Sequence, residues 1–137
     1  MSKANKKPAP LPKLVIGVDD HGRLMTMANG LSGPLAQLAE QLLTELERAR
    51  VVAQHKVPDN VIGMGSTASF TTSDGFNQTF QLVYPDEANV SEGKISVLTP
   101  IGAALIGLAE GQSIPWEARD GRELSLTVLK VEQKAQA

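Results

Sequence analysis

The chain has 137 residues with a formal net charge of −2, and 42% of its residues are hydrophobic. This length suits one domain, or one small domain with an appendage, built around a modest core. The slightly acidic balance argues against free-standing DNA binding through a basic surface, although it allows a protein partner that itself holds nucleic acid.

The sequence also bounds the redox chemistry and the compartment. It contains no cysteine, which excludes a disulfide framework and thiolate chemistry. Its first residues are polar and rich in proline, without the apolar segment of a signal peptide. No apolar run approaches the roughly 20 residues that span a bilayer. We therefore expect a cytoplasmic protein with no membrane contact.

Residues 1–13 combine lysines with prolines and carry little apolar surface that folding could bury. This composition predicts a disordered tail. The lysines could contact nucleic acid electrostatically, but the composition favours a solvated tail.

A short helix is predicted from Asp19 to about Ala28, after an apolar run at residues 14–18. The side chains of Asp19 and Asp20 can cap its start. A dense turn signal at residues 29–34 then ends it.

Residues 35–56 carry the clearest helical pattern, which Pro34 can open from the first helical position. Apolar side chains recur every three or four residues on one face. They are Leu35, Leu38, Leu42, Leu46, Ala49 and Ala53. About 20 residues make a helix of roughly 30 Å, about twice the length of the preceding one. Two helices joined by a short loop pack antiparallel, so residues 14–57 are predicted to form a lopsided helical hairpin, a short coiled coil.

The pattern changes to a period of two between Val61 and Tyr84, which predicts strands. Ala68 and Phe70 alternate with polar residues, and the turn residues at 73–75 predict a hairpin between two strands.

The most distinctive motif lies at residues 95–111. Residues 95–98 read as a short buried strand. Thr99 offers a hydroxyl at the N-cap position of a short helix, and Pro100 suits the first helical position, where a missing N–H is tolerated.

Two further strands, at residues 113–117 and 123–132, are predicted to form a hairpin around Asp120 and Gly121. The sum is a helical hairpin followed by about five or six mostly antiparallel strands, with one short helix against them. This order of elements predicts the α+β class.

Catalytic and metal-binding patterns are absent from the sequence. A metal site needs three or four convergent ligands, and a catalytic histidine needs a placed partner. His21 and His55 lie on different predicted elements without such companions, and Asp19 with Asp20 fits helix capping better than a carboxylate pair. No phosphate-binding glycine loop is present. We therefore predict no catalytic residue, no metal site and no cofactor.

The motif Ile95-Ser-Val-Leu-Thr-Pro-Ile-Gly-Ala-Ala-Leu-Ile-Gly107, with Leu126-Thr-Val-Leu-Lys-Val-Glu132, resembles the C-terminal domain of the bacterial Gre transcript cleavage factors. Within that superfamily, the chain is similar to the regulators of nucleoside diphosphate kinase over roughly residues 15–132. The resemblance implies an FKBP-like domain at residues 58–137 behind a short coiled coil. It also implies binding to RNA polymerase.

In the Gre factors, the tip of the coiled coil presents acidic residues that hold a metal ion in the polymerase active centre. The corresponding tip of this chain has no carboxylate. It consists of Asn29, Gly30, Leu31, Ser32 and Gly33. The resemblance therefore implies a protein without transcript cleavage activity.

Thr99, Pro100 and Ile101 match the loop by which Gre C-terminal domains grip a coiled coil at the entrance of the polymerase secondary channel. The resemblance thus implies a non-enzymatic regulator that binds RNA polymerase near this channel and competes with Gre-type cleavage factors. It would contact nucleic acid only indirectly, as a monomer or weak dimer.

Two other functions stay open. One is an FKBP-like prolyl isomerase, although Pro100 and Ile101 occupy the place where such enzymes carry an aromatic residue. The other is a dimerising interaction module, since the stripe with Leu38, Leu42 and Leu46 could pair between two chains.

Overall fold

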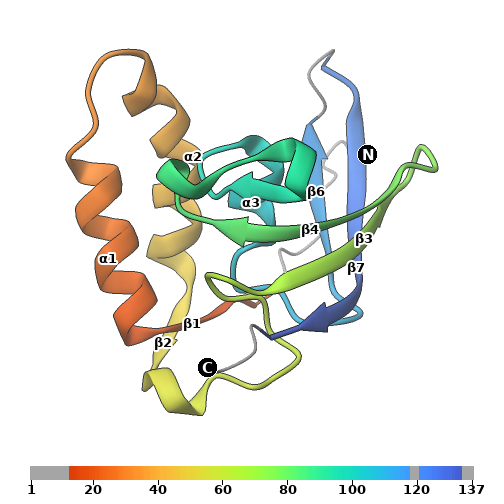
Figure 1. The fold of residues 1–137 in the computed structure, drawn as a ribbon, viewed down its shortest axis with the longest axis horizontal. Helices are drawn as coiled ribbons and strands as arrows, with labels where there is room; N and C mark the ends of the chain where they lie inside the picture. Colours follow the sequence, from red (N-terminus) through yellow and green to blue (C-terminus); the bar gives the residue numbers. More distant parts are fainter. Residues whose placement is uncertain (1–12, 118–120, 134–137) are drawn as a thin grey trace, which may run out of the picture.

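Helices and a mostly antiparallel sheet make up residues 13–117 and 121–133, the part of the chain that the computed structural model describes (Figure 1). The α+β class predicted from the sequence is confirmed. Apart from Lys13, the predicted tail at residues 1–13 lies outside the described residues, and so does Asp120 of the last predicted turn. Within the described residues, no helix is long and apolar enough to cross a membrane.

Two helices form the N-terminal part, α1 (Val18–Asn29) and α2 (Pro34–Arg48). They lie side by side and are joined by the loop 30–33 (Figure 1). Pro34 opens α2 as predicted, after Gly33 turns the chain with a φ of 63°. With 12 and 15 residues, the helices differ little in length, so the expectation that the first is about half as long as the second is wrong.

The predicted helix at residues 35–56 ends early, at Arg48. Strand β2 (Arg50–Val52) follows and pairs in parallel with β1 (Val15–Gly17), and the 3-10 turn η1 (Gln54–Lys56) comes next. The backbone N–H of Arg50 donates to Leu14 O at 2.9 Å. This long-range pairing, together with the β-branched Val51 and Val52, overrides the local helical pattern.

The start of α1 also differs from the expectation. Its N-cap is Gly17, which makes no side-chain cap, whereas Asp19 and Asp20 lie within the first turn. The backbone N–H groups of both aspartates donate hydrogen bonds to Gln54 Oε1, at 2.9 and 3.1 Å. A side chain from η1 therefore supplies the cap that the sequence assigned to the aspartates.

A five-stranded sheet forms the rest of the fold, in the order β5-β4-β3-β7-β6. The strands are β3 (Thr67–Thr72), β4 (Asn77–Val83), β5 (Lys94–Ser96), β6 (Ser113–Glu117) and β7 (Glu123–Glu132). Within this sheet, the pair β4 and β5 runs parallel and the other described pairs are antiparallel. The short turns η2 (Pro85–Glu87) and η3 (Val90–Glu92) connect β4 to β5. The predicted hairpin at residues 73–75 joins β3 to β4.

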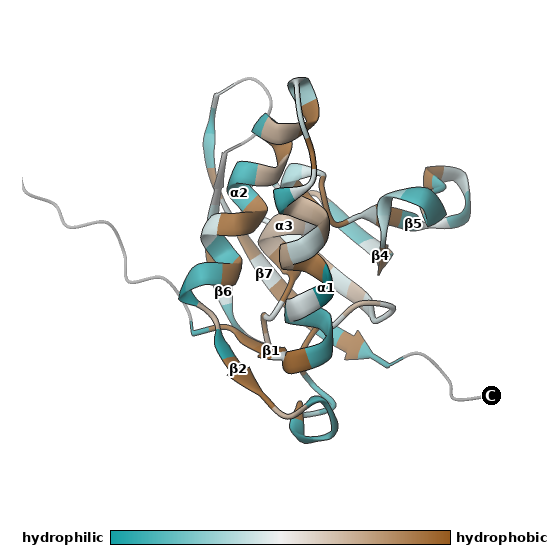
Figure 2. Ribbon diagram, turned by 90° about the vertical axis from the view of Figure 1, so that its left-hand side faces the viewer, coloured by the Kyte–Doolittle hydropathy of each residue, from teal (hydrophilic) through white to brown (hydrophobic). Residues whose placement is uncertain are grey.

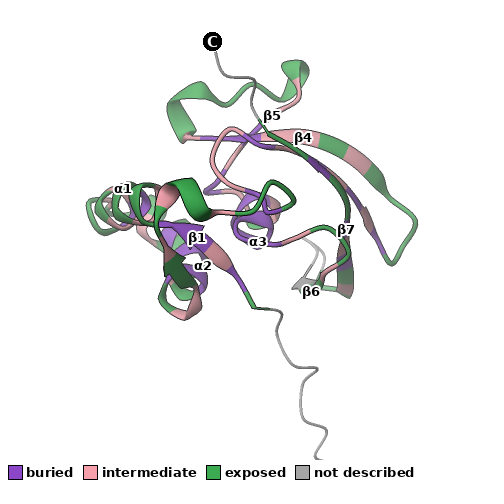
Figure 3. Cartoon of the chain, turned by 90° about the horizontal axis from the view of Figure 1, so that it is seen from below, coloured by how far each residue is buried: buried purple, intermediate pink, exposed green. Residues whose placement is uncertain are grey.

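The short helix α3 (Pro100–Leu105) lies on the inner face of the curved sheet, where Figure 3 shows it buried. It shares one hydrophobic cluster with the fully buried Phe70, Leu82 and Leu126 of the sheet. Leu42 and Leu46 of α2 belong to the same hydrophobic cluster. The helical part and the sheet therefore share one core, while a unit boundary between residues 57 and 58 stays a prediction.

This burial bears on the dimerisation alternative. Leu42 is 0% exposed and Leu46 is 1% exposed. Two of the three leucines proposed to pair between chains are thus already used inside one chain.

Candidate functional site

The corner between β5 and α3 contains the three residues that the sequence singled out for partner binding. The hydroxyl of Thr99 accepts a hydrogen bond from the backbone N–H of Gly102 at 3.0 Å and donates to Ser96 O at 2.8 Å. The N-cap role predicted for Thr99 is confirmed. Because both hydrogen bonds are internal, the Thr99 hydroxyl shapes the corner.

Gly102 allows the chain to fold this tightly. A Cβ atom at this position would lie 2.1 Å from Ser96 O and 2.9 Å from Thr99 Oγ1. No side chain other than hydrogen fits at that distance. This requirement could not be predicted from the sequence, because a glycine in the first turn of a helix gives no local sign of a close approach from the preceding strand.

The three corner residues differ in exposure. Pro100 is exposed, whereas Thr99 and Ile101 are half-buried. Ile101 packs against the hydrophobic core, which fixes its position from behind. Pro100 therefore presents the apolar surface of the corner, and its two neighbours hold it in place.

A side chain from α2 also reaches the corner. Gln41 Nε2 donates a hydrogen bond to Pro100 O at 3.4 Å. The sequence gives no sign of this contact, because the two residues are 59 positions apart. Figure 2 shows α2 and α3 next to each other, as this contact requires.

The loop between α1 and α2 lies away from the start of α1. The backbone N–H of Gly30 donates to Thr26 O and Met27 O, which closes the last turn of α1. Leu31 packs against the core, whereas Ser32 and Gly33 are exposed. None of these loop residues carries a carboxylate.

The two histidines have separate environments. His21 Nε2 lies 3.1 Å from Leu46 O and so links α1 to the end of α2, whereas His55 is exposed in η1. Asp20 Oδ2 accepts a hydrogen bond from the backbone N–H of Met64 at 3.3 Å. Within residues 13–117 and 121–133, no group of three or more histidines or acids could hold a metal ion.

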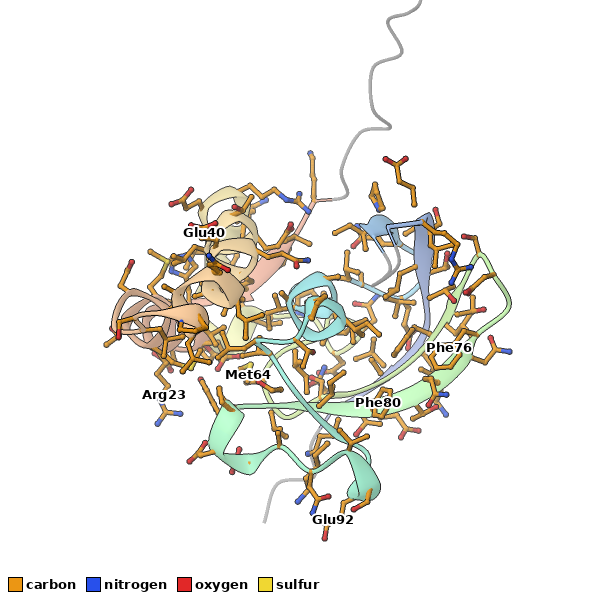
Figure 4. The ribbon with its side chains drawn as sticks, turned by 90° about the horizontal axis from the view of Figure 1, so that it is seen from above. Arg23, Glu40, Met64, Phe76, Phe80 and Glu92 are labelled. Carbon is orange, nitrogen blue, oxygen red and sulfur yellow. The ribbon has the colours of Figure 1, made fainter. Side chains whose placement is uncertain are left out.

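Another contact joins α1 to Tyr84, the residue that follows β4. The guanidinium of Arg23 lies over the ring of Tyr84, 5.8 Å from its centroid, a distance typical of a cation–π interaction. Partial burial raises the pKa of the Tyr84 phenol, and Arg23 partly opposes this effect. Figure 4 labels Arg23 at the edge of α1 and Met64 between this helix and the sheet.

Comparisons with known proteins decide the family. Residues 57–133 match the family described as "Transcription elongation factor, GreA/GreB, C-term", and residues 12–52 match "Rnk N-terminus". The "Regulator of nucleoside diphosphate kinase" of Escherichia coli (strain K12) is 39% identical over 101 residues, which cover 73% of this chain and 74% of the relative. The chain belongs to the GreA/GreB family.

Further relatives of this GreA/GreB-family chain are named as transcription elongation factors. "Transcription elongation factor GreA" of Brucella canis is 36% identical over 117 residues, covering 80% of this chain and 74% of that protein. The solved structure of a "Prokaryotic transcription elongation factor GreA/GreB from Nitrosomonas europaea" superposes with a TM-score of 0.69 at 36% identity. The superposition covers 88% of this chain and 98% of that one.

The two family matches divide the candidate residues. The corner at residues 99–101 lies within the GreA/GreB C-terminal match, and the loop at residues 29–33 lies within the Rnk N-terminal match. Gln41, which donates a hydrogen bond to Pro100 O at the corner, also comes from the Rnk N-terminal match. In this GreA/GreB-family chain, residues of both matches therefore meet at the corner.

Proposed function

We propose that this chain is a non-enzymatic regulator that binds RNA polymerase near its secondary channel and competes with Gre-type cleavage factors. Family membership supports a role in transcription, because the matched relatives are named as elongation factors or as a regulator. Such a role belongs in the cytoplasm. Residues 14–57 would act as a short coiled coil, and residues 58–137 as an FKBP-like unit.

The exposed Pro100 is the observation that carries the proposal. An interface anchor works best when it is rigid, because little conformational freedom is then lost on binding. Pro100 has a fixed φ, and the hydrogen bonds of Thr99 and the buried side of Ile101 hold the surrounding backbone. An apolar side chain held in this way can dock on a helical rod without any catalytic group.

The sequence of the tip supports a regulator that does not cleave RNA. A bound divalent cation needs oxygen ligands at about 2–2.5 Å, and residues 29–33 contain no carboxylate. Asp19 and Asp20 lie at the other end of α1, about 15 Å from the tip at 1.5 Å per residue. Asp20 also accepts a hydrogen bond from the Met64 backbone.

Two assays with purified core RNA polymerase test the proposal. In the first, increasing amounts of the protein are added to polymerase carrying a labelled GreA; we expect displacement of GreA. In the second, the protein is added with Mg²⁺ to arrested elongation complexes; we expect no RNA shortening above the intrinsic rate of the polymerase. Failure to displace GreA at any concentration overturns the proposal that the chain binds RNA polymerase. Metal-dependent shortening of the RNA overturns the proposal that the chain lacks cleavage activity.

A further inference from the structure

The first two turns of α2 expose apolar side chains beside the corner. Leu35 is 49% exposed and Leu38 is 44% exposed, although Leu42 of the same helix is fully buried. Leu35 precedes Leu42 by seven residues, or about two turns, so both face the same side of α2. The apolar stripe of α2 therefore continues past the edge of the core towards the tip.

The hydrogen bond from Gln41 fixes where this exposed segment lies. Gln41 Nε2 donates to Pro100 O at 3.4 Å. Residues three apart are neighbours on a helix surface, so Leu38 lies one turn from Gln41 on the side of α2 that meets the corner. We refer to the exposed residues Leu35, Leu38 and Pro100 together as the leucine–proline surface.

The charge of this segment indicates an apolar contact. Glu40 is the only charged residue between Pro34 and Thr44. It comes two positions before Leu42, a rotation of about 200°, and therefore points away from the core side of α2. Its place on α2 can be followed in Figure 4, where it is labelled.

We propose that Leu35 and Leu38 bind the same apolar helical segment of RNA polymerase that engages Pro100, so that the leucine–proline surface forms one docking site. This inference rests on the proposed function. Continuity with Pro100 supports it, since a single exposed proline is a small contact and energetic anchors are normally surrounded by further contacts that exclude water.

A second copy of the chain fits this surface less well. A stable interface buries about 800 Å² on each partner, far more than two half-exposed leucines provide. The other leucines of the stripe, Leu42 and Leu46, are buried within the chain.

The test measures the affinity of the full chain for purified core RNA polymerase by displacement of labelled GreA. The variant is Leu35→Ser with Leu38→Ser, and the matched control is Leu129→Ser, which removes a leucine 56% exposed on β7. We expect the double variant to bind at least tenfold more weakly, and the control to bind as the wild type does. If the double variant does not fold, the single variant Leu38→Gln replaces it in the test, because glutamine is a good helix former.

The outcomes separate this inference from the proposed function. Wild-type affinity of the leucine variants, together with weakened binding of Pro100→Ala, overturns the inference and leaves the proposed function standing. No binding by the wild type overturns both. Sedimentation of the wild type and the double variant adds a third outcome: a dimer that the leucine substitutions abolish would assign the surface to a second copy and overturn the inference.

Discussion

The side-chain oxygen of Gln54 lies 2.9 Å from the backbone nitrogen of Asp19, a residue 35 positions earlier in the chain. The same oxygen accepts a hydrogen bond from the backbone N–H of Asp20. Two of the N–H groups that a helix start leaves without partners are thus satisfied from η1. This contact ties α1 to the segment that follows α2.

Gln54→Ala is expected to lower the free energy of unfolding by about 1 kcal/mol, the usual cost of removing a helix cap. Chemical denaturation measures the change. Gln37→Ala, at an exposed position of α2, is the matched control and should be near neutral. Equal stability of both variants would mean that the Gln54 cap contributes nothing.

Gly17→Ala provides a second test of the same cap. A Cβ atom on Gly17 would lie 2.2 Å from Gln54 Oε1, so the substitution should displace the capping amide. The effects of Gly17→Ala and Gln54→Ala should therefore be less than additive in a double-mutant cycle. Full additivity would indicate that Gly17 and Gln54 act separately.

The sequence allowed the prediction of elements whose signals are local. The strand pair around residues 73–75, the start of α2 at Pro34 and the Thr99 cap of α3 all depend on residues within a few positions of one another. The prediction failed where the determining partner is distant. Strand β2 forms because β1 is available to pair with it, and no turn residue separates β2 from α2.

The same distinction applies to the candidate site. Thr99 and Pro100 could be found from their cap and first-turn positions. That they bind RNA polymerase is an expectation from the family resemblance and stays a prediction. Gln41 could not be found, because its contact with Pro100 O depends on how α2 packs against α3. Gly102 could not be recognised as essential without the position of Ser96 O.

A pair of glycine substitutions tests the shape of the corner. Gly102→Ala should destabilise the protein by about 1–3 kcal/mol, because its Cβ would collide with the backbone oxygen of Ser96. Gly22→Ala in α1 meets no atom within 4 Å and should stabilise by up to about 1 kcal/mol. Thermal unfolding compares the two variants. A neutral Gly102→Ala would show that the corner is looser than the Thr99 hydrogen bonds indicate.

Leu42→Ala tests whether residues 14–57 and 58–137 unfold separately. The shared core predicts a loss of about 2–5 kcal/mol and a single transition. Circular dichroism at helix wavelengths reports mainly on α1 and α2, and the fluorescence signal comes from Trp116, the only tryptophan in the sequence and a residue of β6. Coincident curves support one unit. A helix signal lost before the fluorescence change would establish two units with a boundary near residue 57.

Tyr84 predicts a dependence of stability on high pH. Partial burial raises the pKa of its phenol above the ordinary value of 10.0, with Arg23 partly opposing the shift. The folded state therefore holds the proton more tightly than the unfolded state, and stability should fall as the pH rises above about 10. Because Tyr84→Phe cannot ionise, the stability difference between wild type and variant should change only in that range. A difference that stays constant through pH 11 would contradict this assignment.

The most direct test of the account compares Pro100→Ala with Pro85→Ala, an exposed proline at the start of η2, in displacing labelled GreA from core RNA polymerase. Either change should cost only about 0.4–1 kcal/mol of stability, so both proteins remain folded. We predict that Pro100→Ala loses about 2 kcal/mol of binding free energy, roughly a thirtyfold weaker affinity, and that Pro85→Ala binds as the wild type does. Equal, wild-type affinity of the two folded variants would contradict the claim that the corner before α3 is the polymerase-binding site.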